Sequence, residues 1–136
     1  MTIKDKNHGK NEERTAKIGQ IKSEKTFKEI KLPLDVIVLG MGSDGHTASL
    51  FPCSNELTEA MDPNYPNFLI STNPKNAPYE RISLSAKTIS NSKNIYLHLN
   101  GSEKLQILET ALSLKDINKM PIYNFLKKEL DIYWSP

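Results

Sequence analysis

Residues 34–52, LDVIVLGMGSDGHTASLFP, decide how this chain folds. The stretch opens with four apolar residues, 36–39, three of them β-branched, which predicts a strand buried on both faces. A glycine-rich turn, 40–45, follows, where glycine permits positive φ and close approach of the backbone to a ligand. Ligands of open α/β sheets bind beyond the carboxyl ends of the strands. Asp44 and His46 therefore lie where such folds carry out chemistry.

Length and composition indicate a single globular domain. The 136 residues fit one modest domain, and 38% hydrophobic with 25% charged residues is ordinary for a globular protein. No run approaches the roughly 20 apolar residues of a membrane span, and the N-terminus lacks the apolar segment of a secretory signal. The single cysteine, Cys53, excludes an intrachain disulfide. We expect a cytoplasmic protein with no membrane partner.

The positive charge is concentrated at the N-terminus. Residues 1–31 carry nine Lys/Arg against five Asp/Glu, whereas residues 32–136 carry nine against eleven. The basic segment holds one aromatic residue, Phe27, and nucleic-acid binding needs basic and aromatic residues together on a folded face. We expect no nucleic-acid partner. We interpret 1–31 as a polar leader, disordered or with a short helix at 23–30, and 32–136 as the folded portion.

Strands and helices alternate after the leader, which is typical of an α/β layered sheet. A capping-box arrangement of Asn100 and Glu103 predicts that the longest helix starts there and runs to about residue 114. The sheet is small and has few covering helices, which indicates that part of a larger domain is missing. The predicted strands are 34–39, 68–72, 81–85, 95–99 and 130–134; the other predicted helices are 46–51, 86–92 and 121–128, and 53–66 is predicted as a loop.

The turn formally matches the dinucleotide fingerprint G-x-G-x-x-G, but its context argues against that function. The fingerprint needs a long following helix and an acidic residue at the end of the next strand. Here Pro52 shortens the helix, and Asp62 lies in a loop rich in proline and asparagine. Anion binding by the backbone N–H groups of the turn, which includes Gly42 and Gly45, remains open.

Four side chains are candidates for chemistry. His46 follows Asp44 by two residues on the turn, and the near-neutral pKa of histidine makes it the usual general base; the alternative is a structural histidine. Lys104 lies in the first turn of its helix, where a cation opposes the helix dipole unless an anion is bound there. Arg81 begins a strand and is a second candidate anion ligand. Both cations could equally be solvated surface residues. Nothing in the pattern predicts a metal site.

The block 39–52, LGMGSDGHTASLFP, resembles the signature of the 6-phosphogluconolactonases. Residues 81–85, RISLS, and 100–104, NGSEK, resemble two further motifs of that family, in the same order. The resemblance implies a Rossmann-like sheet of the glucosamine-6-phosphate isomerase superfamily and hydrolysis of 6-phosphogluconolactone without a cofactor. It implies that His46 activates water, that Asp44 orients the site, and that Lys104 and Arg81 hold the phosphate.

Two departures from related families shape the alternatives. Deaminases of the superfamily share the D-G-H turn but carry a catalytic glutamate where this chain reads 47–52, TASLFP, so a deaminase is disfavoured. Lactonases carry an N-terminal half with a phosphate-binding turn, S-G-G-x-[ST]-P, which this sequence lacks. We therefore expect this chain to be the C-terminal half of a lactonase. Three alternatives stay open: it is active alone, it pairs with an N-terminal half, or it is a non-catalytic sugar-phosphate-binding remnant.

Overall fold

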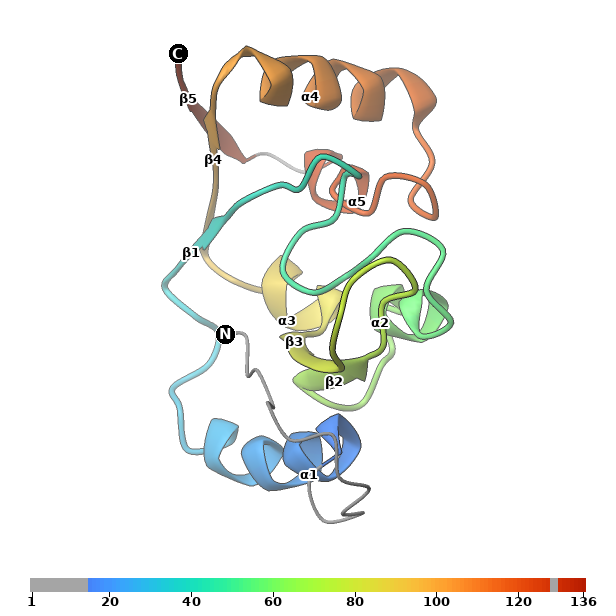
Figure 1. The fold of residues 1–136 in the computed structure, drawn as a ribbon. Helices are drawn as coiled ribbons and strands as arrows, with labels where there is room; N and C mark the ends of the chain where they lie inside the picture. The colour runs from blue at the N-terminus through green and yellow to red at the C-terminus, as the bar shows by residue number, and fades with distance from the viewer. Residues whose placement is uncertain (1–14, 128–129) are drawn as a thin grey trace.

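The computed structural model describes residues 15–127 and 130–136 as an α/β fold (Figure 1). The predicted strands, the helix predicted at 86–92 and the longest predicted helix are present with modest changes of boundary. The helix predicted at 121–128 is shorter, at four residues, and residue 128 lies outside the described residues. In chain order the elements are α1 (Ala16–Phe27), β1 (Val36–Leu39), α2 (Leu57–Met61), β2 (Leu69–Thr72), β3 (Arg81–Leu84), α3 (Ala86–Ser90), β4 (Asn94–Asn100), α4 (Ser102–Leu114), α5 (Tyr123–Leu126) and β5 (Asp131–Ser135).

The strands form two sheets, and not the single small sheet that the sequence predicts. β1, β4 and β5 form a parallel sheet in the order β1-β4-β5, in which Val38 pairs with Tyr96 and His98 pairs with Tyr133. β2 and β3 form a separate antiparallel pair. The α/β class is confirmed. The parallel alignment brings the carboxyl ends of β1 and β4 to one edge, where the glycine-rich turn and the start of α4 follow.

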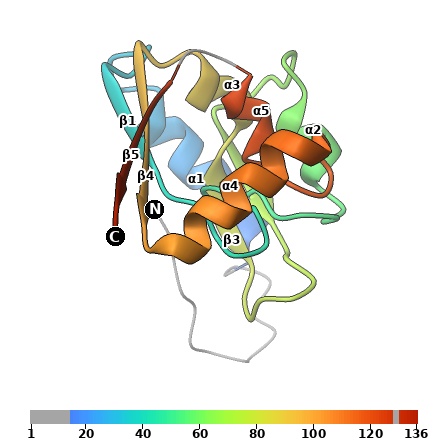
Figure 2. The same ribbon diagram turned by 90° about the horizontal axis from the view of Figure 1, so that it is seen from above.

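The prediction that the first strand is buried on both faces is wrong for the described part of the chain. Val36 and Val38 are 54% and 65% exposed, because the helices lie on the opposite side of the parallel sheet (Figures 1 and 2). The register places Tyr96, next to Val38, on the same side, and its ring lies 5.9 Å from that of Tyr133. We call this side the uncovered face; it comprises Val36, Val38, Tyr96, His98 and Tyr133.

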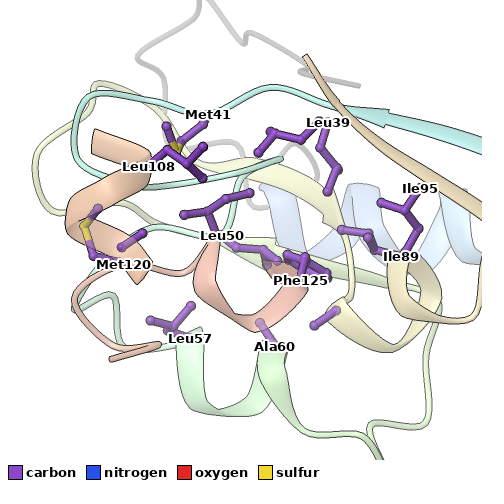
Figure 3. Close-up of a cluster of buried hydrophobic side chains, with 14 of the residues drawn as sticks. Leu39, Met41, Leu50, Leu57, Ala60, Ile89, Ile95, Leu108, Met120 and Phe125 are labelled. Atoms are coloured by element: carbon purple, nitrogen blue, oxygen red, sulfur yellow. The ribbon is translucent and has the colours of Figure 1, made fainter. Parts of the chain in front are cut away.

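The core lies between the covered face of the parallel sheet and the helices (Figure 3). Leu97 and Leu99 of β4 are almost inaccessible to solvent, as is Phe125 of α5. Leu50, which follows the glycine-rich turn, is also completely buried in this cluster. Burial of such side chains contributes roughly 1.5–3 kcal/mol each, so the segment that carries the candidate site is anchored in the core.

The predicted leader divides at Thr15. Residues 1–14 lie outside the described residues, and Thr15 caps α1 by accepting a hydrogen bond from the N–H of Ile18. This helix starts and ends earlier than the predicted helix at 23–30. Its polar residues Gln20 and Glu24 are buried, so α1 packs as part of the fold.

Gln20 and Glu24 bind the free edge of β2 in the way a neighbouring strand would. The Glu24 carboxylate accepts hydrogen bonds from the N–H groups of Phe68 and Leu69 at 2.6 and 2.9 Å. The Gln20 amide donates to the carbonyl of Leu69 at 2.8 Å and accepts from the N–H of Ser71 at 2.8 Å. Covering a strand edge satisfies its backbone and blocks pairing with other chains.

Replacing Glu24 with alanine is expected to destabilise the fold by about 1–3 kcal/mol for each backbone donor left unpaired. The buried N–H group of Leu69 and the part-buried N–H group of Phe68 would both lose their acceptor. Urea unfolding followed by circular dichroism measures the change. Lys25→Ala, at an exposed position of the same helix, is the control. Equal stability of the two variants would contradict a role for α1 at the edge of β2.

Two local predictions near the site are wrong. Residues 46–51 form a turn and not a helix: the N–H of Leu50 donates to the carbonyl of Thr47 at 2.9 Å, and Ala48 has φ +50°. A residue with positive φ cannot continue a right-handed helix. The loop predicted at 53–66 contains α2, a short helix whose Leu57 and Ala60 are buried in the core.

The predicted capping box of α4 is also absent. The N-cap is Gly101, with φ +87° and no side-chain hydrogen bond to the helix. The Asn100 side chain instead donates to the hydroxyl of Ser135 in β5 at 2.9 Å. The first turn of α4 therefore begins without a side-chain cap, and helix N–H groups in this situation favour an anion.

Candidate functional site

The glycine-rich turn after β1 is closed by its own backbone. The N–H of Gly42 donates to the carbonyl of His46 at 2.9 Å, and the N–H of Gly45 donates to the carbonyl of Gly42 at 3.0 Å. Gly45 has φ +79°, a conformation that glycine adopts without strain. The sequence left open that these glycines bind an anion through their N–H groups. Both groups are engaged inside the turn, so the two glycines contribute shape to the site.

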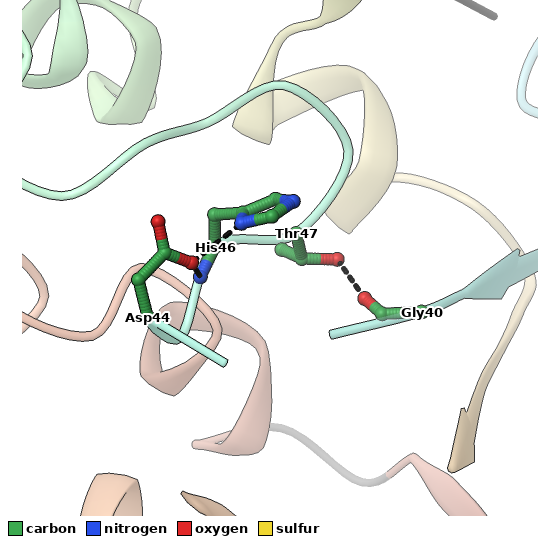
Figure 4. Close-up of polar contacts among 4 residues, drawn as sticks. All are labelled: Gly40, Asp44, His46 and Thr47. Carbon is green, nitrogen blue, oxygen red and sulfur yellow. Dashed lines mark hydrogen bonds and ion pairs between the residues drawn. The ribbon is translucent and has the colours of Figure 1, made fainter. Parts of the chain in front are cut away.

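Contacts with the core hold the turn in place. The Thr47 hydroxyl, which is buried, donates to the carbonyl of Gly40 at 2.7 Å, so it links the two ends of the turn (Figure 4). The carbonyl of Gly45 accepts a hydrogen bond at 3.0 Å from the N–H of Ile122, just before α5. A Cβ added at Gly45 would lie 2.7 Å from the sulfur of Met120. The turn therefore fits closely against the segment that leads into α5.

Asp44 and His46, the two predicted catalytic residues, interact directly (Figure 4). Asp44 Oδ1 lies 2.5 Å from His46 Nδ1 and also accepts a hydrogen bond from the backbone N–H of His46 at 3.0 Å. A carboxylate at Nδ1 favours the tautomer in which Nδ1 carries the proton and Nε2 is the acceptor. The His46 side chain is 29% exposed, so the imidazole is reachable from solvent. This arrangement can deprotonate a water molecule at Nε2.

Phe51 connects the histidine to the predicted phosphate ligand Arg81. The His46 ring stacks on the Phe51 ring with the centroids 4.5 Å apart, and the guanidinium carbon of Arg81 lies 4.9 Å from the centroid of the same ring. Arg81 begins β3, and the Ser83 hydroxyl of that strand accepts a hydrogen bond from the N–H of Ser49 at 3.1 Å. The structure thus places Arg81 and His46 against the same aromatic ring.

Lys104 is placed differently from the other candidates. It lies half-buried in the first turn of α4, which follows the carboxyl end of β4. Among the residues that the structure describes, no hydrogen bond or ion pair joins Lys104 to Asp44, His46 or Arg81. The sequence therefore predicts correctly that Lys104 follows the carboxyl end of a strand. The direct contacts of the site connect Asp44, His46, Phe51 and Arg81, and they do not include Lys104.

The pKa of Asp44 lies below its ordinary value of about 3.9. Partial burial raises this pKa, but the hydrogen bonds from the backbone and the ring of His46, with the positive charge of the protonated ring, together lower it by more. A lowered pKa means that the folded state favours the ionised carboxylate. Asp44 therefore stays charged beside His46 over the physiological pH range.

Replacing Asp44 with asparagine is expected to destabilise the protein near neutral pH and to have a smaller effect in acid. The lowered pKa contributes stability that is present above the unfolded pKa and is lost as the pH falls through the folded pKa. Urea unfolding of both proteins between pH 7 and pH 3 measures the difference. Asp62→Asn is the control, since Asp62 also accepts a backbone hydrogen bond two residues ahead, from Asn64 at 2.8 Å. A pH-independent difference for Asp44→Asn would contradict this linkage.

Other possible sites in the described ranges 15–127 and 130–136 lack a connection to this one. A cavity of about 440 Å³ lies between the segment before β1, the segment before β2 and α3, and it includes none of the predicted site residues. No cluster of three or more His, Cys, Asp or Glu side chains in these ranges has the spacing of a metal site. No helix in them has the length and apolar character needed to span a membrane.

Comparison with known proteins identifies the family. The model of the glucosamine-6-phosphate isomerases/6-phosphogluconolactonase family matches residues 2–134. The chain is 42% identical over 108 residues to a 6-phosphogluconolactonase of Pseudomonas aeruginosa and 40% identical over 107 residues to one of Rhizobium meliloti. The crystal structure of a 6-phosphogluconolactonase from Shewanella baltica superposes with a TM-score of 0.85 at 42% identity, over 90% of this chain and 53% of that one.

The chain thus belongs to the glucosamine-6-phosphate isomerase/6-phosphogluconolactonase family. Its named relatives above are all 6-phosphogluconolactonases, and this confirms the resemblance found in the glycine-rich turn. The matches take up 79% and 76% of this chain but only 45% and 46% of the two curated relatives. The chain therefore spans about half the length of the curated relatives that it matches.

Proposed function

We propose that this chain provides the catalytic base of a cytoplasmic 6-phosphogluconolactonase, which hydrolyses 6-phospho-D-glucono-1,5-lactone to 6-phosphogluconate. The observation that carries the proposal is the Asp44–His46 pair, in which the carboxylate binds Nδ1 at 2.5 Å and leaves Nε2 as the proton acceptor. The pair lies on the motif with the strongest resemblance to the family, at the carboxyl end of a parallel strand, and this supports a catalytic role over a structural one.

In this reaction Nε2 of His46 takes a proton from water while the water oxygen bonds to the lactone carbonyl carbon. The tetrahedral intermediate collapses with cleavage of the bond to the ring oxygen, and the imidazolium returns its proton to that oxygen. Asp44 holds the ring and stabilises its transient positive charge. Arg81 and Lys104 bind the 6-phosphate, and the uncapped first turn of α4 supports this role for Lys104. The chemistry asks for a base, positioning and charge stabilisation, with no cofactor.

We further propose that the uncovered face packs against polypeptide equivalent to the half of the lactonases that this chain does not match. Parallel sheets occur almost only with both faces covered, and here Val36, Val38 and Tyr133 are 54%, 65% and 59% exposed. The matched relatives contain as much chain again as the matched part. A partner of that size and class is the occupant that the comparisons support.

The test measures hydrolysis of freshly generated 6-phosphogluconolactone above its spontaneous rate. The purified 136-residue chain is assayed alone and after co-expression with the unmatched part of the Pseudomonas aeruginosa relative as a separate chain. Activity only in the second sample, with the two chains co-purifying, supports both proposals. Activity of the chain alone supports the catalytic proposal and removes the need for a partner. No activity in either sample, from chains shown to be folded, overturns the lactonase function and leaves a binding remnant.

A further inference from the structure

Three contacts restrict the His46 ring, and only one of them comes from the carboxylate. Asp44 holds the ring edge at Nδ1. Gly42 lies so close that a Cβ there would be 2.1 Å from Cε1 and 2.2 Å from Nδ1 of the ring. Phe51 lies against the ring with an interplanar angle of 28°. The hydrogen bond to Asp44 alone would leave the imidazole free to rotate out of its plane, so Phe51 supplies the missing restraint.

The Phe51 ring also carries the Arg81 guanidinium, at 4.9 Å from its centroid. Cation–π contacts of this kind stabilise a cation above an aromatic ring. Phe51 is 6% exposed and directly follows Leu50, which is completely buried in the core cluster, so its side chain has little free space around it. One buried ring is therefore in contact with both the candidate base and the candidate cation.

We propose that Phe51 is a positioning residue that fixes the distance between His46 and Arg81, and so selects lactones that carry a phosphate a set number of bonds from the reacting carbonyl. The inference rests on the proposed function for its substrate. Its geometric part stands on the two ring contacts alone. A lactone without the phosphate would reach the same base but would gain nothing from the fixed cation.

The experiment compares the parent with Phe51→Leu, Phe51→Tyr and the control Phe68→Leu. Phe68 also packs against another ring, that of Phe27 at 5.7 Å, but it does not contact the site residues. Nuclear magnetic resonance follows the ring protons of His46 and the Nε–H of Arg81, which both sense the ring current of Phe51. We expect both signals to shift together in Phe51→Leu, to stay near their parent positions in Phe51→Tyr, and to be unaffected in Phe68→Leu.

The second readout is the ratio of kcat/KM for 6-phosphogluconolactone and for unphosphorylated gluconolactone, measured with the complementing half where activity requires it. We expect Phe51→Leu to lower kcat/KM for the phosphorylated lactone by about 10–100-fold and to reduce the ratio, and Phe51→Tyr to restore most of both. A purely structural role would lower both rates equally and leave the ratio unchanged.

Two results would overturn the inference: unchanged signals of His46 or Arg81 in Phe51→Leu, or an unchanged ratio of the two lactones. Hydrolysis of neither lactone by the parent would instead overturn the proposed function and, with it, the selection of phosphorylated lactones. In that case the two resonance shifts would still decide whether both groups lie against the Phe51 ring in solution. The failures of the two proposals can thus be told apart.

Discussion

His46→Gln is expected to lower the rate of lactone hydrolysis by about 10²–10⁴-fold, the usual contribution of a positioned general base. Glutamine has a similar length and can still hydrogen bond to Asp44, but it cannot take a proton from water at neutral pH. Because the hydrogen bond to Asp44 at 2.5 Å occupies Nδ1, only Nε2 of His46 can accept the proton. The loss should therefore appear in kcat, with little change in KM.

The measurement is hydrolysis of fresh 6-phosphogluconolactone by the form of the protein that is active, corrected for spontaneous opening of the ring. Lys25→Gln is the control, because Lys25 lies at an exposed position of α1 and belongs neither to the glycine-rich turn nor to the uncovered face. Circular dichroism of both variants checks that they fold. Retention of more than a tenth of the parent kcat in His46→Gln would assign the proton transfer to another group.

Gly42→Ala is expected to have the next largest effect on activity, a loss of about 100-fold. A Cβ at this position would lie 2.1 Å from Cε1 and 2.9 Å from the Asp44 carboxylate, so the imidazole must move. Misplacement of a catalytic group by about 1 Å can cost about this factor. The fold should survive, because the substituted position lies at the surface of the turn and not in the core cluster.

Gly40→Ala provides the comparison for this effect. A Cβ at Gly40 would meet nothing within 4 Å, so the same chemical change two residues earlier should leave the histidine in place. The two variants are compared in kcat and in the resonances of the His46 ring. Equal activity of Gly42→Ala and the parent would mean that the imidazole position in the turn does not limit the reaction.

Most strands were predictable because their signal is local. Short apolar and β-branched runs such as 36–39 and 95–99 indicate strands from their own residues alone. Nearby proline and glycine residues mark where these strands end. The burial of β1 was not predictable in this way. Two-sided burial depends on whether another layer packs on the sheet, and for Val36 and Val38 no layer of the described chain does.

The site was predictable where its residues are neighbours in sequence. Asp44 and His46 are two residues apart on one turn, so their contact follows from the turn itself. The roles of Phe51 and Ser83 were missed. The contact of Phe51 with Arg81 spans 30 residues, and the link from Ser49 to Ser83 depends on how β3 packs. For Phe51 the sequence offered one signal, which is that an aromatic residue lies five positions after the candidate base His46.

The polar side chains that α1 inserts beside β2 also affect how this region exchanges its amide protons. The N–H groups of Phe68, Leu69 and Ser71 are bonded to Gln20 and Glu24, and not to another strand. Their protection from solvent deuterium therefore depends on whether α1 is docked, and opening of the helix exposes all three at once. The exchange rates of these three amides thus report the free energy with which α1 is held on the domain.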